Sequence, residues 1–202
     1  MLQIKRVCAE ILSSNMFILF EEGCSDCWII DIGDYKALSH ELPKNPNIKG
    51  IFLTHGHFDH MADINKVYDL FPNCIIYTSE YGREQLLSAK KNFSYYHKTS
   101  TEYYGDVELI SILKDGDEIC LSNNHILKVL ATPGHCPSCL TYYTDKYIFT
   151  GDSLIPGVEV VTKLPKGNKK LASISIEKIN NLAMDRLICP GHDLTKEYHL
   201  IF

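Results

Sequence analysis

Three histidines and an aspartate lie within six consecutive positions, His55, His57, Asp59 and His60, directly after an apolar run. Imidazole nitrogens and carboxylate oxygens are ligands that zinc takes in proteins. Crowding of this kind has no packing rationale, because buried polar groups need partners and exposed ones gain nothing from it. The spacing therefore predicts a metal site, and a metal held this way can activate water for hydrolysis.

Three more candidate ligands follow, and each comes directly after a glycine at the end of an apolar segment. His55 and His57 are two residues apart, so in an extended segment both side chains point the same way. Asp59 and His60 fall where the chain turns into a helix, which aims them at a second ion about 3.5–4 Å away. We expect the first ion to be held by His55, His57 and His135, the second by Asp59, His60 and His192, with Asp152 bridging the two.

Two of these residues also have simpler interpretations. Asp59 precedes a predicted helix and could be its N-cap, a common position for aspartate. His192 lies in a Pro-Gly-His turn, where a single histidine is more often a loop residue than a ligand. The density of the first cluster favours the metal interpretation for the whole set.

The hydrophobic pattern predicts elements that deliver these residues. Residues 15–20 and 27–32 read as a hairpin, 48–54 as the strand before the histidine cluster, and 61–71 as a helix with apolar residues at helical spacing. Further strands are expected at 74–78, 107–113, 118–121, 125–132, 140–144, 147–150 and 186–189, and further helices at 80–91 and 172–184. The candidate ligands all fall at predicted strand ends.

Size and composition indicate one globular domain over residues 1–202, with 45% hydrophobic and 22% charged residues. The net charge is −5, and the sequence lacks the clustered basic residues expected of a nucleic-acid-binding protein. The N-terminus has charges where a signal peptide has an apolar core, and no apolar stretch is long enough for a membrane span, so we expect a cytoplasmic protein with a small-molecule substrate. The eight cysteines are then reduced, and two C-x-x-C pairs, Cys24/Cys27 and Cys136/Cys139, are of open significance.

Taken together, these motifs resemble the metallo-β-lactamase superfamily, closest to its glyoxalase II-like (hydroxyacylglutathione hydrolase-like) small members. The resemblance rests on the His-x-His-x-Asp-His motif at 55–60, the Gly-His, Gly-Asp and Gly-His pairs ending at 135, 152 and 192, and an early strand-end aspartate, Asp31. It implies an α/β fold, a four-layer αββα sandwich of two mixed β-sheets flanked by helices. Val161 and Lys163 stand where that branch usually has an arginine and an aspartate, and only ten residues follow His192 where glyoxalase II carries a helical glutathione-binding extension.

The predicted activity is hydrolysis of a small ester, thioester or lactone. Two Zn²⁺ ions, or iron or manganese, would lower the pKa of water to about 7 and supply hydroxide, which Asp59 would orient and whose proton it could take. The alternative is an iron-dependent oxidoreductase on the same fold, similar to a persulfide dioxygenase, because the first-site ligands also suit Fe²⁺.

Two further segments have open interpretations. Residues 92–106 are rich in aromatic side chains and could form a wall of the substrate site or pack on the core. A lysine cluster after Asp152 could attract an anionic substrate or belong to a solvated loop. Its members are Lys163, Lys166, Lys169 and Lys170.

Overall fold

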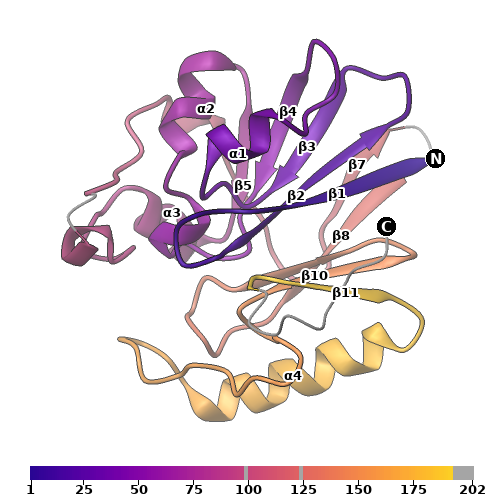
Figure 1. Cartoon of the computed structure of the whole chain (residues 1–202). Helices are drawn as coiled ribbons and strands as arrows, with labels where there is room; N and C mark the ends of the chain where they lie inside the picture. The colour runs from indigo at the N-terminus through magenta and orange to yellow at the C-terminus, as the bar shows by residue number, and fades with distance from the viewer. Residues whose placement is uncertain (98–99, 123–124, 193–202) are drawn as a thin grey trace.

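Two mixed β-sheets pack face to face, and helices cover the outer face of each (Figure 1). The computed structural model describes residues 1–97, 100–122 and 125–192. The predicted four-layer α/β sandwich is confirmed. The ten residues after His192, which include His199 and carry the argument about a missing extension, lie outside the described residues.

The first sheet has the strand order β1-β2-β3-β4-β5-β6. Its first three strands pair antiparallel and the remaining pairs are parallel. The strands are β1 (Leu2–Cys8), β2 (Asn15–Glu21), β3 (Asp26–Ile30), β4 (Asn47–Phe52), β5 (Ile75–Thr78) and β6 (Ile110–Ile112). Helices α1 (Tyr35–Ser39), α2 (Ile64–Leu70) and α3 (Glu80–Leu86) lie on its outer side (Figure 1).

The second sheet has the order β11-β10-β9-β8-β7 and is antiparallel except for the parallel pair β10 and β11. Its strands are β7 (Glu118–Ser122), β8 (His125–Ala131), β9 (Leu140–Tyr143), β10 (Tyr147–Gly151) and β11 (Leu187–Pro190). Helix α4 (Lys169–Ala183) covers its outer face (Figure 1). Among the described residues, no helix has the length and apolar character needed to cross a membrane.

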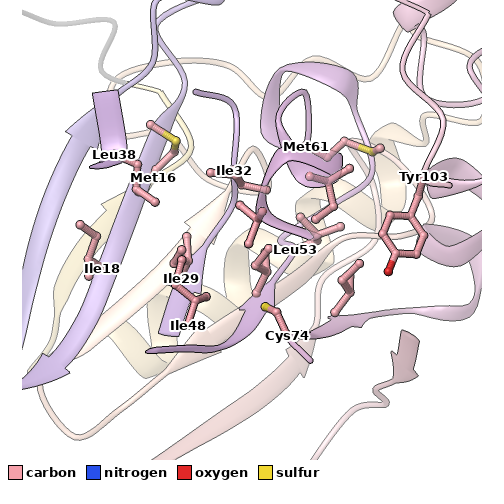
Figure 2. Close-up of a cluster of buried hydrophobic side chains, with 14 of the residues drawn as sticks. Met16, Ile18, Ile29, Ile32, Leu38, Ile48, Leu53, Met61, Cys74 and Tyr103 are labelled. Carbon is pink, nitrogen blue, oxygen red and sulfur yellow. The ribbon is translucent and has the colours of Figure 1, made fainter. Parts of the chain in front are cut away.

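Strand β2 is buried on both faces, which explains its almost continuously apolar sequence. Phe17 and Leu19 point into the core between the two sheets, where they join residues of the second sheet such as Phe149. Met16 and Ile18 point the other way, into the cluster under the helices that Figure 2 shows. A strand buried on both faces needs apolar side chains at every position.

Two elements were not expected, and several helix boundaries differ from those expected. Strand β1 was not expected, because only Ile4 and Val7 of its side chains are buried and its edge position leaves the rest polar. The five-residue helix α1, capped by Asp34, is too short to show a periodic pattern. Helix α2 begins at Ile64 rather than at 61, because a 3₁₀ turn at Phe58–His60 comes first. Helix α3 ends at Leu86 instead of continuing to 91, and α4 begins three residues early at Lys169, where Asn168 caps it.

Candidate metal centre

The seven predicted ligands all lie at one edge of the sandwich, where strands of both sheets end. The 55–60 loop follows β4 of the first sheet, while the other three ligands follow β8, β10 and β11 of the second. A hydrogen bond from Leu140 N to Thr54 O (2.7 Å) joins the two sheets at this point. The structure thus brings together every predicted site residue: His55, His57, Asp59, His60, His135, Asp152 and His192.

The first group consists of His55, His57 and His135, whose ligand nitrogens lie within 4.8 Å of one another. His57 Nδ1 is 2.9 Å from His135 Nε2. All three side chains are buried. Three convergent nitrogens without a carboxylate among them match the set expected for the first ion.

The second group consists of Asp59, His60 and His192. The two Nε2 atoms of His60 and His192 are 3.2 Å apart, and Asp59 Oδ2 lies 3.4 Å from the first and 3.3 Å from the second. Asp59 therefore faces the site instead of capping a helix, and the N-cap of α2 is Asp63. This set matches the one expected for the second ion.

Asp152 lies between the two groups. Its Oδ1 is 3.5 Å from the Nε2 atoms of both His60 and His192, and its Oδ2 is 3.6 Å from His135 Nε2. One carboxylate oxygen therefore faces each group, the placement that a bridging ligand needs.

The donor set fits metal ions. Two ligands about 2.0–2.1 Å from a tetrahedral zinc ion lie roughly 3.3–3.4 Å from each other, and the measured separations of 2.9–3.6 Å bracket that value. The buried Nε2 of His55 and Oδ1 of Asp152, which face the cluster, have no hydrogen-bond partner among the described residues. Native proteins rarely leave such atoms unpaired unless an ion or water satisfies them. The cluster is a metal-binding His/Asp site.

Asp31 supports this site from behind. It is 1% exposed, with φ at 57°, and its carboxylate accepts hydrogen bonds from Thr54 N and Thr54 Oγ1 (both 2.7 Å). The same carboxylate is 2.8 Å from His60 Nδ1. It therefore fixes the ring so that Nε2 faces the cluster, the usual role of a carboxylate behind a ligand histidine. The expectation for Asp31 is confirmed, whereas the contribution of Thr54 was not predicted.

Two backbone carbonyls orient the remaining histidines, and sequence reasoning missed both. His135 Nδ1 donates to Val161 O at 2.8 Å, and His192 Nδ1 donates to Leu12 O at 3.0 Å. These bonds assign the proton to Nδ1 in each ring and leave Nε2 free to bind a metal. No signal for them exists in the sequence, since any residue supplies a carbonyl.

Two glycines allow the chain to pass close to the cluster. Gly151 has a φ of 50°, which glycine adopts at no steric cost. A Cβ atom at Gly191 would overlap Asp152 Oδ1 and lie 3.0 Å from His60 Cε1. The glycines before Asp152 and His192 are therefore required by space and backbone conformation.

The two histidine groups differ in charge. Burial and the neighbouring His135 lower the pKa of His57 to about 3. Burial also lowers the pKa of His60 and His192, but nearby carboxylates outweigh it. Asp59 and Asp31 raise the pKa of His60 to about 9, and Asp152 and Asp59 raise the pKa of His192 to about 11. Without metal, His57 is thus neutral at pH 7, whereas His60 and His192 are protonated.

This difference predicts proton release on metal binding. At pH 7 zinc should displace one proton each from His60 and His192 and none from His57, because ligand nitrogens must be deprotonated, and ionisation of bound water would add to this number. Affinity for the second ion should accordingly rise with pH between 7 and 9. Calorimetric titrations of metal-free protein in buffers with different ionisation heats measure the protons released. A value near zero would contradict the assigned charge states.

The aromatic segment 92–106 divides between the two interpretations. The Phe93 ring lies 5.0 Å from the His57 ring, so it borders the site, whereas Tyr103 is buried in the core beneath the helices. Tyr95 and Tyr96 are exposed. Residues 98–99 of this segment lie outside the described residues.

The lysine cluster is solvated, but only Lys163 and Lys166 lie in a loop, because Lys169 and Lys170 begin helix α4. All four lysines are exposed. The Lys166 ammonium lies 4.8 Å from the centroid of the Tyr81 ring, and Lys169 pairs with Glu159 at 3.3 Å. None of the four lines the cavity at the metal centre.

The second C-x-x-C pair is buried beside the metal loop. Cys136 Sγ lies 3.5 Å from Cys139 Sγ and 3.0 Å from Ser138 Oγ, and Ser138 Oγ accepts from Gly56 N at 3.2 Å. These contacts fix the turn that carries His135 to the loop that carries His55 and His57. Cys136 does not line the cavity at the metal centre. Cys24 is exposed and Cys27 is buried.

Comparisons with known proteins agree with the fold. BLEG-1 B3 metallo-beta-lactamase is 26% identical, with a TM-score of 0.84 over 95% of this chain and 92% of that one. TTHA1623, crystallised in a di-iron-bound form, is 21% identical, with a TM-score of 0.77 over 94% and 92%. ETHE1 from Myxococcus xanthus is 20% identical, with a TM-score of 0.72 over 96% and 77%.

The family model described as the metallo-beta-lactamase superfamily matches residues 15–192. This span includes all seven predicted ligands and Asp31. The chain belongs to the metallo-beta-lactamase superfamily.

Proposed function

We propose that this protein is a metal-dependent hydrolase of a small ester, thioester or lactone, similar to the glyoxalase II-like members of its superfamily. The observation that carries the proposal is the pair of ligand groups joined by Asp152, whose carboxylate oxygens face one group each. His55, His57 and His135 would hold one ion, and Asp59, His60 and His192 the other. Two zinc ions bound there would polarise the scissile carbonyl and lower the pKa of water to about 7, supplying hydroxide.

The residues of the chain then have distinct roles. Burial raises the pKa of Asp59, but His60 and the hydrogen bond with His192 lower it below its usual range, so the carboxylate is ionised at pH 7. With Oδ2 facing the second ligand group, it can orient the attacking water and accept its proton at Oδ1. The new C–O bond forms with the water oxygen, the C–O or C–S bond of the substrate breaks, and the leaving group takes a proton.

Metal content combined with a substrate panel tests this function. Purified protein would be analysed for zinc, iron and manganese, stripped with a chelator, reloaded with each metal, and assayed with thioesters, lactones and phosphodiesters. We expect the zinc-loaded protein to hydrolyse the carbonyl substrates. The stripped protein should lose at least 100-fold in rate, because a Lewis-acidic metal stabilises the transition state by several kcal/mol. Iron content with oxygen consumption, and no hydrolysis, would instead favour the oxidoreductase.

A further inference from the structure

A cavity of about 240 Å³ opens directly beside the metal centre. Its walls include the ligands His135, Asp152 and His192. The rest of its lining is aliphatic apart from one glutamate: Leu12, Ile155, Val158, Glu159, Val160 and Val161. Binding pockets for whole small molecules are usually about 300–1,000 Å³, so this cavity holds only part of a substrate.

The cavity offers no charge to an anionic group. None of the residues that line it is a lysine or an arginine. Glu159 pairs with Lys169 at 3.3 Å, and its side chain is 84% exposed, so its carboxylate lies at the rim. An acidic substituent buried among these aliphatic side chains would lose its hydration without a cationic side chain among the lining residues to pair with.

The aliphatic walls are fixed to the metal ligands through the backbone. The carbonyls of Leu12 and Val161 accept the hydrogen bonds from His192 and His135 described above. The side chains of the same two residues are 58% and 51% exposed. Leu12 also has a φ of 49°, an uncommon conformation for leucine. Two partly exposed aliphatic residues are thus held by their backbones next to the metal ligands.

The opposite wall is a tight turn after Asp152. Val158 N donates to Ile155 O at 3.1 Å, the two residues form a β-bridge, and Gly157 has the positive φ (76°) that such a turn requires. Thr150 Oγ1 donates to Leu154 O at 2.6 Å and holds the turn against β10. The wall is therefore formed before a substrate arrives.

From this arrangement we infer that the cavity binds an uncharged, short aliphatic acyl group, which makes the protein selective for esters or thioesters of small aliphatic acids. The inference rests on the proposed hydrolase function and specifies its substrate class. Leu12, Val158 and Val161 determine the specificity without touching the reacting atoms. Each methylene of the acyl chain that leaves water here should improve the reaction roughly two- to fourfold.

The test uses zinc-loaded protein and a series of N-acetylcysteamine thioesters with acetyl, propionyl, butyryl and succinyl groups. We expect kcat/KM to rise two- to fourfold per methylene from acetyl to butyryl, mainly through KM, and succinyl to be the poorest substrate. Val158→Thr keeps the side-chain shape but adds a hydroxyl, and Leu12→Asn suits the positive φ and keeps the carbonyl. Both should flatten the rise, whereas Val107→Thr, at an exposed valine outside the cavity, should not.

The outcomes separate this inference from the proposed function. Equal kcat/KM across the acyl series, or succinyl as good as butyryl, would overturn the inference and leave the hydrolase intact. If no thioester is hydrolysed, the proposed function fails, and calorimetric titration with butyrate decides about the cavity. Butyrate binding that Val158→Thr weakens would support the aliphatic site, and absence of binding would overturn it.

Discussion

Replacing His57 with alanine should abolish hydrolysis and leave the protein folded. The substitution removes one of three nitrogens at the first ion, so the loss should exceed the roughly 10–100-fold that follows from losing a residue that merely supports a ligand. The fold should persist, because the pKa of His57, lowered to about 3, keeps the ring neutral at pH 7 and its removal strands no charge. Steady-state kinetics and circular dichroism measure the two effects.

A matched control for this variant is His40→Ala. His40 is exposed and ends helix α1, and it has no partner in the metal cluster. Its replacement should leave both turnover and zinc content unchanged. Turnover that persists in a metal-stripped preparation of His57→Ala would contradict the proposed mechanism.

Asp31→Ala should have the largest effect on stability. The carboxylate is buried and satisfies the backbone and hydroxyl of Thr54 together with the His60 ring. Its removal leaves Thr54 N and His60 Nδ1 buried without this partner, and removing one member of a buried ion pair costs about 3–5 kcal/mol of unfolding free energy. Because His60 also loses its orienting partner, zinc affinity should fall roughly 10–100-fold. Urea unfolding of the metal-free protein and zinc titration measure these quantities.

Asp34→Ala provides the comparison for that variant. Asp34 is also an aspartate near the end of β3, but its side chain caps α1 through Ala37 N at 3.0 Å and accepts one longer, exposed bond from Glu10 N at 3.4 Å. Loss of an N-cap costs about 1 kcal/mol. If Asp31→Ala destabilised the protein no more than Asp34→Ala, the buried network would not have the energetic role assigned to it.

The seven ligands could be predicted because their residue types are rare outside metal sites at such spacing. His55 and His57 share one side of an extended segment, and the turn at Phe58–His60 redirects Asp59 and His60, as expected. The helix cap proposed as the alternative role of Asp59 was wrong, because Asp59 lies within a 3₁₀ turn and α2 begins only at Ile64, with Asp63 as its N-cap. The organisation of residues 1–202 as one domain stays a prediction.

The features that were not predicted depend mainly on backbone atoms, which every residue has, or on contacts between distant parts of the chain. The carbonyls of Leu12 and Val161 leave no mark in residue type. The aliphatic cavity combines Leu12 with residues 155–161, far away in sequence, and those residues show neither strand nor helix periodicity. Strand β1 escaped because its edge position leaves polar side chains along most of its length. Local patterns thus revealed the ligands but not the surroundings that hold them or face the substrate.

The ligands come from both sheets, and this has a mechanical consequence. His55 to His60 belong to a loop of the first sheet, while His135, Asp152 and His192 belong to the second. Bound ions would therefore link the two sheets, which are otherwise held together mainly by apolar contacts. Ions that bind only the assembled state add their binding energy to its stability. Once the ions leave, the two sheets should separate first at this edge. Loss of the ions would then both stop hydrolysis and loosen the packing between the sheets.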